Sequence, residues 1–133
     1  MPTAVEDKDA IREVLAEYCY ALDNYQFAGM AGLFIEDGTW DTAFGKATGH
    51  KAIADLAASF TKDIAEPPRR VHYVTNITIR LSGDTAEVRS NWIMILNSAN
   101  GPTLSSGGEY ADRMARRGGK WMFAYRKIDR FLK

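Results

Sequence analysis

The hydrophobic pattern of this chain changes once, at Pro67-Pro68. Before that point apolar residues recur every three or four positions, which is the spacing of a helix buried along one side. After it, β-branched and aromatic residues form four runs separated by turn signals, which is typical of consecutive strands. Helices first and strands afterwards predict an α+β domain, in which helices cover one face of an antiparallel meander. The 133 residues fit one domain, 1–133.

The first half is predicted to contain three helices, over residues 9–22, 26–34 and 50–64. A short strand is expected at 39–41, and a loop at 45–49. The first helix is the clearest, because its apolar residues fall on one stripe: Ile11, Val14, Leu15, Tyr18, Cys19 and Leu22. The proline pair ends the third helix, because proline has no amide donor and restricts the residue before it.

The second half is predicted to contain four strands, over residues 71–81, 86–96, 104–116 and 121–131. The first of them breaks strict alternation. One face carries His72, Val74 and Asn76, whereas the other carries the apolar set Ile77, Ile79 and Leu81. Either a bulge intervenes or both faces are covered. We favour a partner copy on the outer face and therefore expect a homo-oligomer, a dimer or a trimer.

Charge and cysteine content argue against several classes of function. Basic and acidic residues number 17 each, so the formal net charge is zero and no footprint for nucleic acid is present. The pairs Arg69-Arg70 and Arg116-Arg117 are interpreted as solvated loop ends. The single cysteine, Cys19, permits no internal disulfide. The first residues are polar and acidic, and no apolar stretch is long enough to span a bilayer, so we expect a cytoplasmic protein without membrane association.

Asp23 is the first candidate for chemistry. It lies four residues after Cys19 and so continues the buried stripe at the end of the first helix. A carboxylate is disfavoured there, because an unpaired buried charge is costly and the C-terminal end of a helix dipole is negative. Such a position predicts a cationic or strongly donating partner. A C-terminal cap or a solvated turn residue is an equally good interpretation of the spacing alone.

His72 is the candidate partner. A lone histidine at the start of a strand is more often a core residue than a catalyst, but the chain has only two histidines, and His50 is expected at an exposed helix start. Imidazole can take a proton near neutral pH, and a carboxylate on one ring nitrogen would stabilise the imidazolium. No serine or cysteine nucleophile stands in a motif, so the pair would act directly on substrate. Too few histidines and cysteines are present, and none at ligand spacing, for a zinc site.

Several short motifs occur in a characteristic order along almost the whole chain. They are Tyr18 to Asp23, Leu33-Phe34, Asp37 to Trp40, Gly49 before Ala52-Ile53, His72 to Asn76, Gly108 to Asp112, and Gly119 to Trp121. In this order and spacing the chain resembles the SnoaL-like branch of the nuclear transport factor 2-like superfamily. The resemblance implies a cone-shaped, cystatin-like fold, in which a curved sheet and three N-terminal helices enclose a pocket.

The resemblance also implies a mechanism. Scytalone dehydratase and hexachlorocyclohexane dehydrochlorinase pair an aspartate on the first helix with a histidine at the start of a long strand, and Asp23 and His72 match those positions. This implies proton abstraction next to a leaving group, with no cofactor and no metal. The second catalytic histidine of scytalone dehydratase falls near Ser98. Its tyrosine falls near Thr42, as does the base of ketosteroid isomerase, so that isomerase mechanism is not supported.

Aromatic residues are the candidates for the rest of the site. Tyr18 is the first choice to donate a hydrogen bond to a developing oxyanion, because it precedes Asp23 on the same stripe, and Tyr110 is the second. The candidate substrate-binding residues are Trp40, Asn76, Trp92, Tyr110 and Phe123. Asp112 and Arg113 are interpreted as exposed strand residues.

These residues favour a lyase or isomerase that acts on a small hydrophobic carbonyl or cyclic molecule. Two alternatives stay open. One is a non-catalytic ligand-binding or assembly module, because this fold also serves such roles. The other is a polyketide-type cyclase that uses Asp23 alone as its acid and base.

Overall fold

The stripe predicted for the first helix is present in the computed structural model of the chain, which describes residues 1–133. Helix α1 spans Ala4–Asp23, so it begins at Ala4 rather than at residue 9. The earlier start follows from a cap, because the Thr3 hydroxyl accepts a hydrogen bond from the Glu6 amide at 3.1 Å. The stripe is buried as predicted, with the exception of the half-buried Val14.

The other two helices are shorter than their patterns predict. Helix α2 spans Phe27–Ala31, and α3 spans His50–Ser59 rather than continuing to residue 64. After Ser59 the amides of Phe60 and Thr61 bond to carbonyls three residues back, which tightens the chain into turns. The apolar residues after Ser59 keep the sequence spacing of a helix, but they lie outside α3.

The predicted short strand is longer, and the predicted loop after it is a strand. Strand β1 spans Phe34–Thr42 and forms an antiparallel hairpin with β2, Gly45–Thr48. Strand β1 also runs parallel to β6, Lys120–Leu132, far along the sequence. Because this pairing is long-range, the local pattern around residues 39–41 predicts a strand that is too short.

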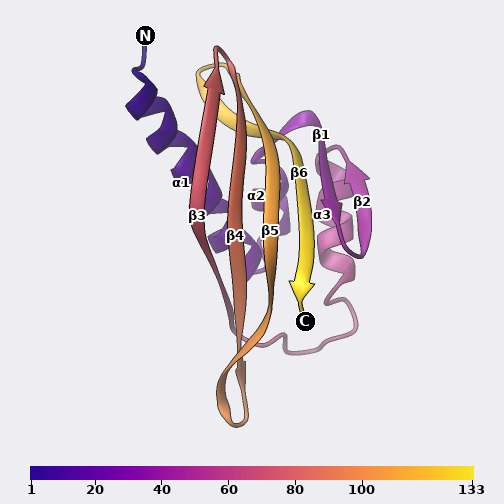
Figure 1. Cartoon of the computed structure of the whole chain (residues 1–133). Coiled ribbons are helices and arrows are strands. Elements are labelled where there is room, and N and C mark those ends of the chain that lie inside the picture. The colour runs from indigo at the N-terminus through magenta and orange to yellow at the C-terminus, as the bar shows by residue number, and fades with distance from the viewer.

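The four predicted strands of the second half are confirmed as a meander. They are β3, Arg70–Ser82, β4, Thr85–Ser98, β5, Gly101–Arg117, and β6. The sheet has six strands in the order β2-β1-β6-β5-β4-β3, and only β1 and β6 are parallel (Figure 1). It is therefore a mixed sheet with an antiparallel majority.

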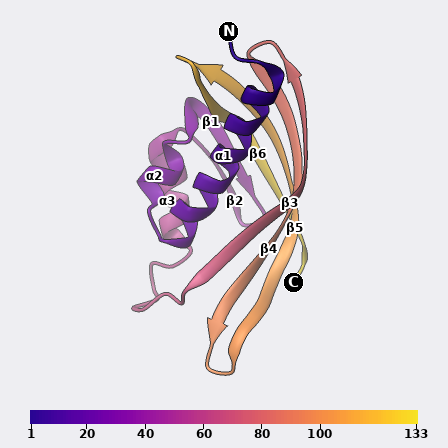
Figure 2. The same cartoon turned by 90° about the vertical axis from the view of Figure 1, so that its left-hand side faces the viewer.

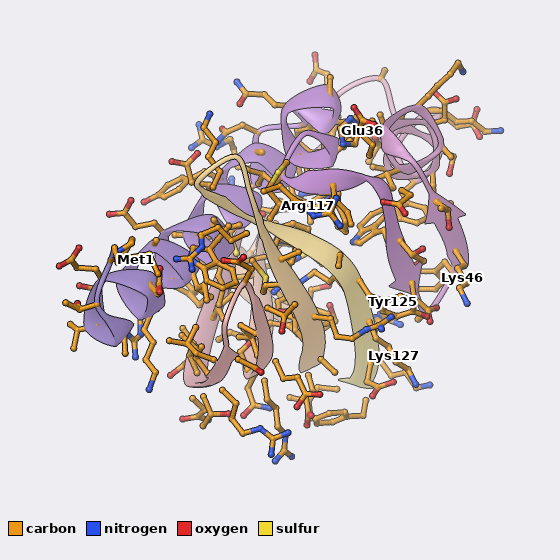
Figure 3. All side chains as sticks on the ribbon, turned by 90° about the horizontal axis from the view of Figure 1, so that it is seen from above. Met1, Glu36, Lys46, Arg117, Tyr125 and Lys127 are labelled. Carbon is orange, nitrogen blue, oxygen red and sulfur yellow. The ribbon has the colours of Figure 1, made fainter.

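All three helices lie on one side of the sheet, which bends around them (Figure 2). The buried core lies between these two layers and has α1 and the inward faces of β4, β5 and β6 as its main contributors. Seen from above (Figure 3), Tyr125 of β6 and Lys46 of β2 lie at the same edge, where the Lys46 ammonium is 5.6 Å from the centre of the Tyr125 ring. The Tyr125 hydroxyl donates to Asp41 of β1 at 2.5 Å and so ties β1 to β6. The α+β fold predicted from the sequence is confirmed.

A bulge resolves the irregular alternation of β3. Thr75 pairs with Asn91 and Thr78 pairs with Arg89, so Asn76 and Ile77 together stand opposite one residue of β4. Asn76 takes the left-handed conformation that this requires, with a φ of 54°. The bulge returns Ile77, Ile79 and Leu81 to the face that carries His72, where they pack against the core. Our preference for two covered faces was wrong for this strand, so the alternation no longer supports a partner copy, and homo-oligomerisation stays a prediction.

Candidate active site

A pocket of about 410 Å³ is lined by residues of α1, α3 and the sheet. This volume is in the range of about 300–1,000 Å³ that is typical of small-molecule sites. Most of its lining is apolar or aromatic. The lining side chains that can form hydrogen bonds are Tyr18, Trp40, Thr42, Arg70, His72, Trp92, Ser106, Tyr110 and Arg130. Phe44 and Phe60 also line it and are partly exposed, so the pocket reaches the surface between the β1–β2 hairpin and the end of α3.

Asp23 and His72 are in direct contact. Asp23 is the last residue of α1, and His72 is the third residue of β3. The Asp23 carboxylate forms two hydrogen bonds with His72. Its Oδ1 lies 2.5 Å from the ring Nδ1 of His72, and its Oδ2 accepts the His72 backbone amide at 2.8 Å. Both side chains are almost withdrawn from water, with exposed fractions of 10% for Asp23 and 8% for His72. The carboxylate is therefore held at both oxygens.

This arrangement determines which nitrogen of His72 carries the proton. An ionised carboxylate can only accept hydrogen bonds, so Nδ1 is the donor toward Asp23. In the neutral ring, Nε2 then has a free lone pair and can accept a proton. His72 itself lines the pocket, whereas Asp23 lies behind it and does not line it. The His72 ring is thus the member of the pair that borders this pocket, and the carboxylate bonded to it is not.

Arg70 is a site residue that sequence reasoning missed. The chain was expected to be solvated at Arg69-Arg70, but the Arg70 side chain lines the pocket and is 14% exposed. Its Nη2 donates to the carbonyl of Leu22, its guanidinium lies 4.3 Å from the centre of the Tyr25 ring, and its Nε lies 3.9 Å from Asp23. The interpretation as a loop end was wrong because long-range contacts with the end of α1, absent from the local sequence, bury this side chain. The same holds for Arg116, which bonds to Asp7 and Asp84.

Two tyrosines, Tyr18 and Tyr110, line the pocket. The Tyr18 hydroxyl accepts the Trp40 ring N–H at 2.9 Å, which leaves its own proton available for a ligand. Burial raises the pKa of Tyr18 to about 12, although the nearby Arg126 cation opposes the shift. Burial also raises the pKa of Tyr110 well above its ordinary value. Both hydroxyls therefore remain protonated donors across the physiological range.

Beneath these two rings lies a buried ion pair that the sequence did not reveal. Arg126 and Asp112 have fully buried side chains and form two hydrogen bonds, of 2.8 and 3.1 Å. The Arg126 guanidinium packs at 4.2 Å from the Tyr18 ring centre and at 3.6 Å from that of Tyr110. Burial alone would lower the pKa of Arg126, but the facing carboxylate raises it above its ordinary value. The prediction that Asp112 is exposed was wrong, and its alternation with Tyr110 and Met114 was the available signal.

The structure brings together most of the predicted site residues. Trp40, Trp92 and Tyr110 line the pocket with Tyr18 and His72, and the Trp92 ring lies between His72 and Tyr110, at 5.7 Å from each.

Two predicted pocket residues lie elsewhere, which corrects the sequence analysis. The Asn76 side chain is exposed and donates to Asn91, because the bulge turns it away from the pocket. Phe123 is fully buried in the core, where its ring faces Phe34, Tyr18 and Arg126.

Other reactive groups are positioned for structural roles. His50 is largely exposed, and its Nε2 lies 2.6 Å from the Phe34 carbonyl, outside the pocket. Burial raises the pKa of the Cys19 thiol to about 11. Nowhere in the structure do three His, Cys, Asp or Glu side chains converge as metal ligands. None of the helices has the length and hydropathy to cross a bilayer.

Comparisons with known proteins identify the family. The family model described as the SnoaL-like domain matches residues 3–127, so the chain belongs to the SnoaL-like family. Comparison with curated proteins finds no significant match.

Solved structures share the fold along almost the full chain. A Mycobacterium tuberculosis protein of unknown function is 27% identical over 97% of this chain and 76% of its own, with a TM-score of 0.85. A Novosphingobium aromaticivorans protein, named provisionally as a scytalone dehydratase, is 25% identical over 95% of this chain and 85% of its own, with a TM-score of 0.80. A Catenulispora acidiphila protein solved in complex with S-DNPA is 21% identical over 92% of each chain, with a TM-score of 0.83, and this likeness shows the fold alone.

Proposed function

We propose that this protein is a cofactor-independent lyase or isomerase that removes a proton from a small hydrophobic carbonyl or cyclic substrate. The observation that carries the proposal is the 2.5 Å contact between Asp23 Oδ1 and His72 Nδ1, in a ring that lines the pocket. A base needs a free nitrogen toward the substrate and a stabilised charge after it takes the proton. In this contact the carboxylate occupies Nδ1, which leaves Nε2 free, and supplies the counter-charge.

In the proposed reaction, His72 Nε2 takes a proton from the carbon next to the substrate carbonyl. The electrons of the broken C–H bond form an enolate, whose oxygen accepts hydrogen bonds from Tyr18 or Tyr110. In elimination, these electrons then form the C=C bond as the leaving group departs with its bonding pair. Where the leaving group is hydroxide, the imidazolium returns the proton and water is released. In isomerisation, the imidazolium returns the proton to another carbon of the same molecule.

The tyrosines support this step because they donate to negative charge without losing their own protons. Donors held in a water-poor pocket stabilise a developing oxyanion more than donors in bulk water do. Asp23 is the positioning residue, because it touches His72 and not the pocket. The provisional name of the Novosphingobium relative agrees with elimination, and the S-DNPA complex of the Catenulispora relative agrees with a small-molecule ligand.

The geometry favours this proposal over the cyclase alternative. A cyclase that uses Asp23 alone needs the carboxylate to face the ligand, whereas this pocket is lined by His72 and not by Asp23. A binding or assembly module needs no such pair, and it would bind ketones without exchanging their protons.

The test follows proton abstraction without requiring the natural leaving group. The protein is incubated in deuterated water with a panel of cyclic ketones, with and without a β-hydroxyl or β-halide, and exchange and elimination are followed by NMR. On substrates that react, His72→Ala is expected to lower the rate by on the order of 10²–10⁴.

His50→Gln is the matched control, because it changes the only other histidine, outside the pocket. It is expected to keep the rate of the wild type. Equal rates for the wild type and His72→Ala on a reacting substrate would refute the base assignment. No exchange or elimination across the whole panel, by a protein that still binds these ketones, would favour the binding module.

A further inference from the structure

The charges around the pocket restrict the ligand. The lining contains two guanidinium groups, those of Arg70 and Arg130, and no carboxylate. Arg70 is already balanced, because its Nε lies 3.9 Å from Asp23 and its Nη2 is bonded to the Leu22 carbonyl. The two arginines therefore differ in what they can offer a ligand.

Arg130 has no carboxylate within ion-pair distance. Its guanidinium carbon lies 5.5 Å from the centre of the Phe44 ring, which also lines the pocket. The preceding residue, Asp129, is exposed, and successive residues of a strand point to opposite faces. Asp41, on the neighbouring strand β1, accepts the Tyr125 hydroxyl. One positive charge at the pocket wall is thus without a partner.

This charge lies across the pocket from the base. His72 is on β3 and Arg130 is on β6, and strands β4 and β5 lie between them. Three strand spacings separate their backbones by about 14 Å, before the length of the side chains is considered. A ligand that touches both therefore spans the pocket, with its reacting carbon and its charged end at opposite walls.

We propose that the pocket takes a hydrophobic ring compound with one carboxylate, which Arg130 binds at the end away from the carbon that faces His72. A guanidinium matches a carboxylate with two parallel N–H···O bonds, and the Phe44 ring holds the guanidinium at the mouth. Ser106, also in the lining, adds a hydroxyl on β5, the strand next to Arg130. This inference rests on the proposed function, because it names the substrate class of the same site.

The test compares two probes that have the same rings and differ in charge, 2-naphthoic acid and 2-naphthamide. Binding is followed by tryptophan fluorescence, because Trp40 and Trp92 line the pocket. The acid is expected to bind about tenfold or more tightly than the amide, which is the usual scale of a hydrogen bond to a charged group. Arg130→Gln is expected to abolish this preference, and Arg130→Lys to keep part of it.

Arg69→Gln is the matched control. It removes one positive charge from an exposed position beside Arg70, outside the lining, and is expected to keep the preference. Equal affinities of the wild type for acid and amide, no saturable binding of the acid, or an unchanged preference in Arg130→Gln would each overturn the proposal. Circular dichroism of each variant verifies that it is folded.

Neither probe has a leaving group, so the titration is independent of turnover. A preference for the acid, in a protein that exchanges no substrate proton, would overturn the proposed function and leave this inference standing. Proton exchange on neutral ketones, together with equal affinity for the two probes, would overturn this inference and leave the proposed function standing.

Discussion

Two carboxylates at or beside the pocket are withdrawn from water, and each faces a nitrogenous side chain. Asp23 faces His72 at the pocket wall, and Asp112 faces Arg126 beneath the pocket. Both contacts are short and both acids are held at two oxygens. They differ in the partner's chemistry and in its access to a ligand.

The Asp112–Arg126 pair contains a permanent cation and is sealed from water. Arginine does not lose its proton in proteins, and this one lies among three aromatic rings, those of Tyr18, Tyr110 and Phe123. The Asp23–His72 pair contains an imidazole, a side chain that can exist neutral or charged, and this imidazole lines the pocket. A buried carboxylate whose partner is always charged is suited to structure, and one whose partner can change charge is suited to the chemistry proposed above.

The largest expected effect tests the chemical pair. Asp23→Asn keeps the shape of the side chain but offers one oxygen and one NH₂ group in place of two oxygens. The His72 backbone N–H must be accepted by the oxygen, so the NH₂ group faces Nδ1 and forces the proton onto Nε2. A ring in this tautomer is no base, and we expect a rate loss on the order of 10³–10⁴.

Nitrogen-15 NMR of the imidazole provides the direct measurement, with Nδ1 protonated in the wild type and Nε2 protonated in Asp23→Asn. Asp84→Asn, a carboxylate-to-amide change on the surface, is expected to leave both tautomer and rate unchanged. The same tautomer in wild type and Asp23→Asn would contradict the proposed geometry.

The next effect tests the sealed pair. Arg126→Met leaves Asp112 buried without its cation, and breaking a buried pair in this way costs about 3–5 kcal/mol of unfolding free energy. Removing both charges, with Asp112→Leu and Arg126→Met together, is expected to recover most of the loss. Chemical denaturation measures the unfolding free energy of the single and the double variant.

Arg89→Met is the control for the sealed pair, because its bond to Glu109 is exposed to solvent. It is expected to leave the denaturation midpoint almost unchanged. Equal midpoints for Arg126→Met and Arg89→Met would show that the buried pair is not a structural element.

The smallest effect concerns the tyrosines that lie between the two pairs. Burial raises the pKa of Tyr18 from 10.0 to about 12, so the folded state keeps a proton that the unfolded state releases above pH 10. The stabilisation is therefore present below pH 10 and is lost as the pH rises through 12. At 1.36 kcal/mol per pKa unit, this amounts to about 3 kcal/mol.

Thermal unfolding between pH 9 and 12 follows this loss, and tyrosinate absorbance follows the ionisation. Tyr18→Phe is expected to lose less stability at alkaline pH than the wild type. Tyr20→Phe, which changes an exposed residue of the same helix, is expected to lose as much as the wild type. Ionisation of all six tyrosines in one transition would contradict a protected Tyr18.

Much of this protein could be predicted from local pattern. The stripe of α1 and the four long strands are consequences of periodicity, which any window of sequence contains. Asp23 could be singled out because a carboxylate on a buried stripe requires a partner. The resemblance then implied both the fold, now confirmed, and the pairing with His72.

Other features depend on contacts between distant strands. Strand β2 exists because β1 folds back on it, and the one-residue bulges that place Asn76 outward and Arg126 inward are irregularities of strand register. A shift of one residue moves every later side chain to the opposite face, and no local pattern records it.

The sequence by itself therefore determined the class of fold, and it singled out Asp23 and His72 as the pair proposed for proton transfer. Only the tertiary structure decided that Arg126 and Asp112 form a sealed pair, that Arg70 lines the pocket and that Arg130 stands there without a counter-charge. The physical reason is that periodicity reports which faces are buried, whereas the partner of a buried charge is set by the register and curvature of the sheet.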